Sequence, residues 1–155
     1  MEINSMNKYL LRHSDGHISI LIIKEGTVEG EIAKYSHDVK TSIISYRSLS
    51  DVDIPNSREF RNAWCDISQE SKIDIHADKA RNILLDNVRE QRKFMLESLD
   101  KDFIIALENN DQVKLGQIKT EKNRLRAITD PLKNLTVAES ATDADIAYMK
   151  SLAVL

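Results

Sequence analysis

The sequence predicts an α+β protein, with a small antiparallel β-sheet head followed by a long helical hairpin and a short C-terminal helix. Two observations lead to this fold class. In the first half, short apolar runs rich in β-branched residues alternate with turn residues, as in β-strands. In the second half, apolar residues recur at helical spacing through a long stretch without Gly or Pro. The change falls near residue 76, so we expect a β-rich N-terminal domain over residues 1–76 and a helical C-terminal region over residues 77–155.

The chain begins with a predicted β-hairpin. Apolar runs at residues 9–11 and 18–23 flank a polar turn that contains Asp15-Gly16, a pair that suits the positive φ angles of a type I′ turn. Residues 30–38 are ambiguous between a single helical turn and a loop. Residues 41–48, "TSIISYRS", are β-branched and aromatic and predict a further strand.

The segment around the single Trp and the single Cys is predicted to be a strand with a packing role. It follows a connection at Pro55, which lacks a donor N–H. Residues 59–67, "EFRNAWCDI", alternate between two faces, neither of them cleanly apolar. Residues 72–75 are expected to return as a short final strand, which gives an antiparallel sheet of four or five strands. We expect Phe60 and Trp64 to tie this head to the helices.

A long helix is predicted from residue 77 to residue 109. At 1.5 Å per residue it would be about 50 Å long, too long for its apolar face to be buried on the sheet alone. Gln91 and Arg92 interrupt the apolar stripe at its middle. They indicate either a kink or a change of packing partner at this point.

A second helix, over residues 112–129, is predicted to fold back on the first. Asn109 and Asn110 can adopt the left-handed conformation that ends a helix, and Asp111 is a favourable N-cap for the next one. The nearly heptad spacing of the second helix is typical of a coiled coil. After a linker, a last helix over residues 143–153 has an expected apolar side of Ile146, Met149 and Leu152, with Tyr148 as a further candidate.

The apolar side chains of these segments are the candidate core or oligomer seam. The stripe of the long helix can be buried by the hairpin, by the sheet or by the same stripe in a second copy, and we expect some self-association. The candidate packing and interface residues are Phe60, Trp64, Leu84, Val88, Met95, Leu99, Phe103, Leu107, Leu115, Ile118 and Leu125.

The composition disfavours several classes of partner. The net charge of -3 is small and the basic residues are spread along the chain, so we expect no nucleic acid partner. No run approaches the ~20 apolar residues of a membrane span, and the first residues do not resemble a signal peptide, so we expect no membrane partner. A single cysteine cannot form an internal disulfide, which indicates a reducing compartment. With four glycines and no phosphate-binding or dinucleotide motif, no cofactor is expected.

Few residues suggest catalysis. Cys65 could act as a nucleophile, but none of His13, His17, His37 and His76 stands in a recognisable signature with it, so a packed thiol is the simpler interpretation. Strand pairing can bring His13 and His17 together across the hairpin turn. Two histidines still lack the third ligand of a metal site, and solvated hairpin ends explain them as well. We therefore expect no catalytic residues and no metal site.

The polar residues of the long helix are interpreted as structural. His76, Asp74 and Asp78 lie at its start, where capping and compensation of the helix dipole are expected. Mixed charges farther along predict a solvated face with weak i,i+4 pairs, formed by Arg81, Asp86, Arg89, Glu90, Arg92, Lys93 and Glu97.

Three stretches resemble a family of small phage and prophage accessory proteins found beside tail and tail-fibre genes. They are "REFRNAWCD" at residues 58–66, "KARNILLDNVREQRKFMLESLDKDFIIALENND" at residues 79–111, and "EKNRLRAITD" at residues 121–130. The N-terminal "YLLRHSDGHISIL" and the "DVDIP" before the Trp segment also fit the family. The resemblance thus covers most of the chain, and it brings no catalytic residue with it.

The resemblance implies a non-enzymatic phage protein, either a component of the virion tail or tail fibre or a tail assembly chaperone. The expected partners are other phage tail or tail-fibre proteins and further copies of the chain. The expected location is the virion tail, or the host cytoplasm during assembly. The alternative is an intracellular adaptor or regulatory protein that acts on host machinery through the charged long helix.

Overall fold

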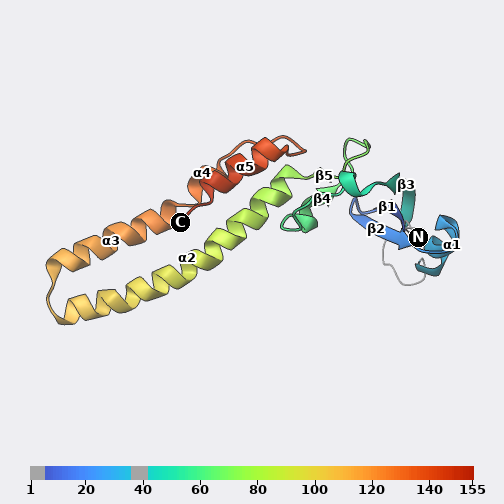
Figure 1. The fold of residues 1–155 in the computed structure, drawn as a ribbon. Coiled ribbons are helices and arrows are strands. Elements are labelled where there is room, and N and C mark those ends of the chain that lie inside the picture. The colour runs from blue at the N-terminus through green and yellow to red at the C-terminus, as the bar shows by residue number, and fades with distance from the viewer. Residues whose placement is uncertain (1–5, 36–41) are drawn as a thin grey trace, which may run out of the picture. The chain divides into compact units, whose positions relative to one another are not determined.

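The computed structural model describes residues 6–35 and 42–155, and the chain divides into two compact units, Met1–His76 and Ala77–Leu155. The first unit contains the β-strands and the second the long helices (Figure 1). This is the expected α+β fold class, with an antiparallel head, a helical hairpin and a C-terminal helix.

The head is built on a three-stranded antiparallel sheet with strand order β2-β1-β3. Strand β1 (Asn7–His13) is central, between β2 (Ile18–Ile23) and β3 (Ile43–Leu49). The predicted hairpin and the strand predicted over residues 41–48 are therefore confirmed, although Thr41 lies outside the described residues. Because successive side chains of a strand point to opposite faces, Leu10 and Leu11 serve two different cores.

The hairpin turn differs from the predicted type I′ turn. Gly16 has a φ of 83°, but Asp15 does not have the positive φ that a type I′ turn requires. The N–H of Gly16 donates to the carbonyl of His13 at 3.0 Å, and the N–H of His13 donates to the carbonyl of His17 at 3.0 Å. This is the pattern of a three-residue loop in which Gly16, in the left-handed conformation, forms a bulge.

Helix α1 (Val28–Tyr35) covers one face of the sheet. Val28 and Ile32 of this helix pack with Leu11, Leu21 and Ile23 of the strands. The ambiguous segment of residues 30–38 is thus helical as far as residue 35, and residues 36–38 lie outside the described part. Thr27 accounts for the start of the helix, because its Oγ1 accepts a hydrogen bond from the N–H of Gly30 at 3.2 Å.

A two-stranded ribbon packs on the other face of the sheet. It consists of β4 (Trp64–Cys65) and β5 (Asp74–Ile75), which pair with each other and with no strand of the larger sheet in the described head. Trp64 and Ile73 pack with Leu10 and Leu49 in the second core of the head. The predicted single sheet of four or five strands is therefore wrong, because the ribbon forms a separate layer.

The strand predicted over residues 59–67 is also largely wrong. Short 3-10 helices occur at η1 (Asp51–Asp53) and η2 (Arg61–Ala63), and β4 begins only after the second. The turn at η2 is closed by the N–H of Ala63, which donates to the carbonyl of Phe60 at 2.8 Å. A turn brings neighbouring side chains to one side of the chain. The predicted alternation is therefore replaced by four consecutive buried residues, Ala63, Trp64, Cys65 and Asp66.

The helical unit begins with α2 (Ala77–Glu108) and α3 (Gln112–Ala127), which lie side by side as the predicted hairpin (Figure 1). Asn110 has a φ of 53° and ends α2 in the left-handed conformation. The N–H of Asp111 donates to the carbonyl of Ala106 and that of Asn110 to the carbonyl of Leu107, which is a Schellman motif. The Asp111 side chain then caps α3 by accepting from the N–H of Lys114 at 3.0 Å. Both signals expected at this turn are confirmed.

Helix α2 changes packing partner along its length. Its second half packs against α3, whereas its first half lies beside α4 (Asp130–Lys133) and α5 (Asp143–Leu152) (Figure 1). Of the two interpretations of the interruption at Gln91 and Arg92, a change of partner fits this arrangement. The predicted linker contains the one-turn helix α4.

Helix α5 docks on its own chain. Ile146 and Met149 are buried, and Leu152 is half-buried. Tyr148 is 55% exposed, so its expected place on the apolar side of α5 is wrong.

Candidate functional site

The candidate packing and interface residues fall into three groups. Those that are buried within the chain are Phe60, Trp64, Leu84, Val88, Leu115, Ile118 and Leu125. Leu99 and Phe103 are half-buried between α2 and α3. Met95 and Leu107 are exposed, so the helical hairpin leaves part of the candidate seam uncovered.

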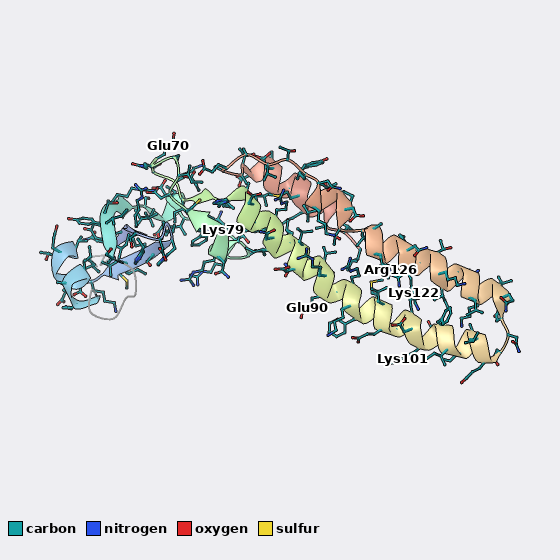
Figure 2. All side chains as sticks on the ribbon, turned by 180° about the vertical axis from the view of Figure 1, so that it is seen from behind. Glu70, Lys79, Glu90, Lys101, Lys122 and Arg126 are labelled. Atoms are coloured by element: carbon teal, nitrogen blue, oxygen red, sulfur yellow. The ribbon has the colours of Figure 1, made fainter. Side chains whose placement is uncertain are left out.

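The two halves of the hairpin are joined at Phe103. Leu99 and Phe103 pack against a buried cluster of Ala106, Leu115 and Ile118. The Lys122 ammonium lies 4.7 Å from the centre of the Phe103 ring and 2.6 Å from a carboxylate oxygen of Asp100. Figure 2 shows Lys122 and Arg126 on the side of α3 that faces α2. Two of the stretches that carry the family resemblance, residues 79–111 and 121–130, therefore contact each other.

The third stretch, residues 58–66, organises the head through Asp66. Its side chain is only 2% exposed, and one carboxylate oxygen accepts from Arg47 Nη2 at 2.9 Å while the other lies 3.6 Å from Arg12 Nε. Arg47 also donates to the carbonyl of Ser71 at 2.6 Å. Arg12 and Arg47 come from the sheet, whereas Asp66 and Ser71 come from the ribbon segment. The carboxylate thus joins the two layers beside Trp64.

Cys65 is buried between Trp64 and Asp66. A reactive thiolate needs partial exposure in a basic setting, and this side chain has little exposure. The position agrees with a packed thiol.

The hairpin does bring His13 and His17 together. Their rings stack with centres 3.9 Å apart, and His13 Nε2 lies 2.8 Å from Ser19 Oγ. His13 is buried, so its interpretation as a solvated hairpin end is wrong. Within residues 6–35 and 42–155, no three His, Cys, Asp or Glu side chains are placed to hold a metal ion. His37 lies outside these ranges.

The polar residues at the start of α2 differ in part from their interpretation. Asp74 does not cap the helix, because its carboxylate accepts from the N–H and the hydroxyl of Ser68. Asp78 lies in the first turn and pairs with Arg81 at 2.7 Å. Arg81 also donates to the carbonyl of Leu135 at 2.6 Å, so it holds the segment before α5 rather than a solvated face.

Three other residues of the predicted charged face also have specific partners. Arg92 donates to the carbonyl of Arg126 in α3 at 3.3 Å. Arg89 and Asp86 form a surface pair at 2.8 Å, with i,i+3 rather than the predicted i,i+4 spacing. The charged face is therefore only partly solvated.

Shifted pKa values occur in exposed local pairs. Partial loss of water raises the pKa of Asp15, but hydrogen bonds from the backbone N–H and the imidazole of His17 outweigh this effect and lower it overall. The hydrogen bond from the Tyr46 hydroxyl lowers the pKa of Glu29, and the same bond raises the pKa of Tyr46. The bond between Glu29 and Tyr46 joins α1 to β3. Both sets of pKa shifts are therefore explained by hydrogen bonds that stabilise the fold.

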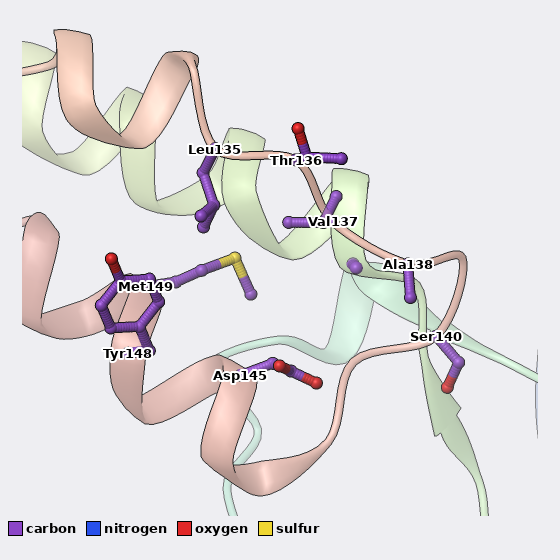
Figure 3. A pocket seen from close by; sticks show the side chains of 9 residues that line it. Leu135, Thr136, Val137, Ala138, Ser140, Asp145, Tyr148 and Met149 are labelled. Carbon is purple, nitrogen blue, oxygen red and sulfur yellow. The ribbon is translucent and has the colours of Figure 1, made fainter.

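A small hollow of about 80 Å³ lies beside α5. It is lined by residues 135–138 and Ser140 from the segment before α5, and by Asp145, Tyr148 and Met149 of the helix (Figure 3). Ligand pockets commonly have volumes of about 300–1,000 Å³. The hollow is therefore better suited to a few waters than to a cofactor.

The most extensive unexplained feature is an apolar surface on the second half of α2. Five large apolar residues of this helix half are exposed, against one, Val113, on α3. They are Phe94, Met95, Ile104, Ile105 and Leu107. The sequence interpretation included Met95 and Leu107 but missed Phe94, Ile104 and Ile105. No signal in the sequence marked these three residues, because which side of α2 stays exposed depends on where α3 packs.

Comparisons with protein-family models, curated proteins and solved structures find no significant match to this chain. Although α2 has 32 residues, no helix among the described residues is both long and apolar enough to cross a membrane.

Proposed function

We propose that this protein is a non-enzymatic, protein-binding component of phage tail or tail-fibre assembly, either as part of the virion or as an assembly chaperone. The resemblance of residues 58–66, 79–111 and 121–130 to tail-associated accessory proteins is the basis of the biological assignment. The structure supports this assignment because each of the three stretches contributes contacts that hold the fold together. Asp66 joins the layers of the head, and Lys122 with Phe103 joins the helices of the hairpin.

The single observation that carries the binding role is the exposed apolar surface of α2. Phe94 is 64% exposed and Ile104 is 56% exposed, on a helix whose opposite side already packs against α3. Several large apolar side chains exposed on one helix of a folded protein commonly mark a protein interface. Burial of this surface by a protein partner, either a tail or tail-fibre protein or a further copy of this chain, would explain its composition.

The test is mass spectrometry of purified particles of the phage or induced prophage that encodes the chain. Copy number is compared with that of the major tail proteins, and infected cells are measured in parallel. A few to tens of copies per particle are expected for a tail component. Absence from particles together with presence in infected cells is expected for an assembly chaperone.

A binding experiment separates this proposal from the host adaptor. The chain is co-expressed with the neighbouring tail and tail-fibre proteins and purified under native conditions. We expect a complex that is weakened by Phe94→Ser and unaffected by Val113→Ser, the matched exposed apolar residue on α3. Failure to bind any tail protein, with a defined complex with a host protein instead, would contradict the proposal and favour the adaptor.

A further inference from the structure

The outward side of α2 carries a heptad row that α3 does not use. Its members recur at alternating intervals of four and three residues, which places them along one line on the helix. This row, named here the outer row, comprises Ile83, Asn87, Glu90, Phe94, Glu97, Lys101, Ile104 and Glu108. All of them except the half-buried Ile83 are exposed. Figure 2 shows Glu90 and Lys101 on the side of α2 that faces away from α3.

The middle of the outer row is complementary to itself in the antiparallel direction. When two copies are opposed about a two-fold axis midway between Glu97 and Lys101, each Glu97 faces Lys101 of the other copy. Phe94 then faces Ile104 of the second copy, and Ile105 lies beside that contact. The same order in the parallel direction would place Glu97 against Glu97 and Lys101 against Lys101. The pattern of charged and apolar residues thus favours the antiparallel orientation of the two helices, in the register that pairs Glu97 with Lys101.

We propose that two copies of this chain associate through the outer rows of α2, antiparallel and about this two-fold axis. The inference rests on the protein-binding role proposed above, and it names a further copy of this chain as one partner and identifies the surface used. The seam is not the stripe of Leu84, Val88, Leu99 and Phe103, because the first two are buried within the chain and the other two pack against α3. The matched charges favour a second copy, because this helix itself carries the complementary order of charges.

The charges in the centre of the row are available for this contact. In the described part of the chain, neither Glu97 nor Lys101 has an ion-pair partner, whereas Asp86 and Arg89 pair with each other. At the ends of the paired region Glu90 faces Glu108, an unfavourable contact that confines the association to the segment between Phe94 and Ile104. The association is therefore short and sensitive to single substitutions.

A charge swap measured by analytical ultracentrifugation of the full chain tests the proposal. We expect a monomer–dimer equilibrium whose dissociation constant rises by about 10-fold or more in Lys101→Glu and in Glu97→Lys, because each places like charges opposite one another. The double variant Glu97→Lys/Lys101→Glu restores complementarity and is expected to return to within about threefold of the original constant. Glu90→Lys is expected to tighten the dimer, since it then faces Glu108.

Matched controls separate the interface from the fold. Phe94→Ala is expected to weaken the dimer, and Val113→Ala and Lys119→Glu, at exposed positions of α3, are expected to leave it unchanged. Far-ultraviolet circular dichroism of each variant should keep the helical signal of the original chain. A chain that is monomeric at every concentration overturns the inference. So does a dimer whose dissociation constant is unchanged by Phe94→Ala, or a double variant that dimerises as weakly as the single variants. A monomer that is nonetheless found in virions would overturn the dimer and leave the proposed tail function standing.

Discussion

At the scale of single residues, Asp66 is the polar group on which the head depends most. Its buried carboxylate is held by Arg47 at 2.9 Å and by Arg12 at 3.6 Å. Asp66→Asn leaves two arginines without their counter-charge, and removing one member of a buried ion pair is strongly unfavourable. We expect the variant to lower the free energy of unfolding of the head by about 2–4 kcal/mol, measured by urea denaturation.

The matched control for Asp66 is Asp51→Asn, which removes the partner of Lys8 at the surface. The Asp51 side chain is 76% exposed, and surface ion pairs contribute at most about 1 kcal/mol. Equal effects of the two substitutions would show that Asp66 acts as an ordinary surface charge. The comparison tests whether burial gives Asp66 its structural role.

At the scale of elements, Gly116 is an unfavourable residue in α3. It lies within the helix, and a Cβ added there would meet no atom within 4 Å. Gly116→Ala is therefore expected to stabilise the helical unit by about 0.5–1 kcal/mol, because Ala loses less backbone entropy on folding. Thermal unfolding should show a rise in midpoint of roughly 2–8 °C for a unit of this size. Gly16→Ala should destabilise the head instead, since Gly16 has a φ of +83°.

The start of α5 is fixed by a reciprocal cap whose effect depends on pH. The Thr142 side chain accepts from the N–H of Asp145 at 3.2 Å, and the Asp145 carboxylate accepts from the hydroxyl and the N–H of Thr142 at 2.7 and 2.8 Å. The bonds from the side chain and backbone of Thr142 lower the pKa of Asp145 from 3.8. A lowered pKa in the folded state gives stability that is present above 3.8 and is lost as pH falls through the folded value.

Thr142→Ala should therefore raise the pKa of Asp145 towards 3.8, because one of its two donors is removed. Titration of the Asp145 carboxyl by NMR measures the change directly. Stability of the helical unit in the variant should depend less on pH below 3.8 than in the original chain. An unchanged pKa would mean that the carboxylate is stabilised by something other than this cap.

Elements with a clear period or a terminal signal could be predicted from the sequence, and elements fixed by tertiary contacts could not. The stripe of α2, the left-handed Asn110 and the cap Asp111 located the helical hairpin. The strand predicted over residues 59–67 was wrong because polar and apolar residues alternate there in the sequence, and the 3-10 turn at Arg61–Ala63 gives no signal of its own. The outer row was missed for a similar reason. Which side of α2 stays exposed depends on where α3 packs, and one helix considered alone does not contain that information.

At the scale of the whole molecule, the division into two compact units predicts two separable unfolding reactions. The chain offers a separate probe for each unit. Trp64 is the only tryptophan and is buried in the head, so its fluorescence reports the head, whereas far-ultraviolet circular dichroism is dominated by α2 and α3. We expect the two probes to give different urea midpoints, which is the standard sign that unfolding is not a single two-state transition.

Core substitutions in each unit make this prediction specific. Leu125 and Leu10 are both 0% exposed, one in the helical unit and the other in the core of the head beside Trp64. Replacement of a buried leucine by alanine costs about 2–5 kcal/mol of stability. Leu125→Ala should therefore shift the circular dichroism transition and leave the fluorescence transition in place, and Leu10→Ala should do the reverse. If either substitution moves both transitions equally, the head and the helices unfold as one cooperative body, which would contradict the prediction.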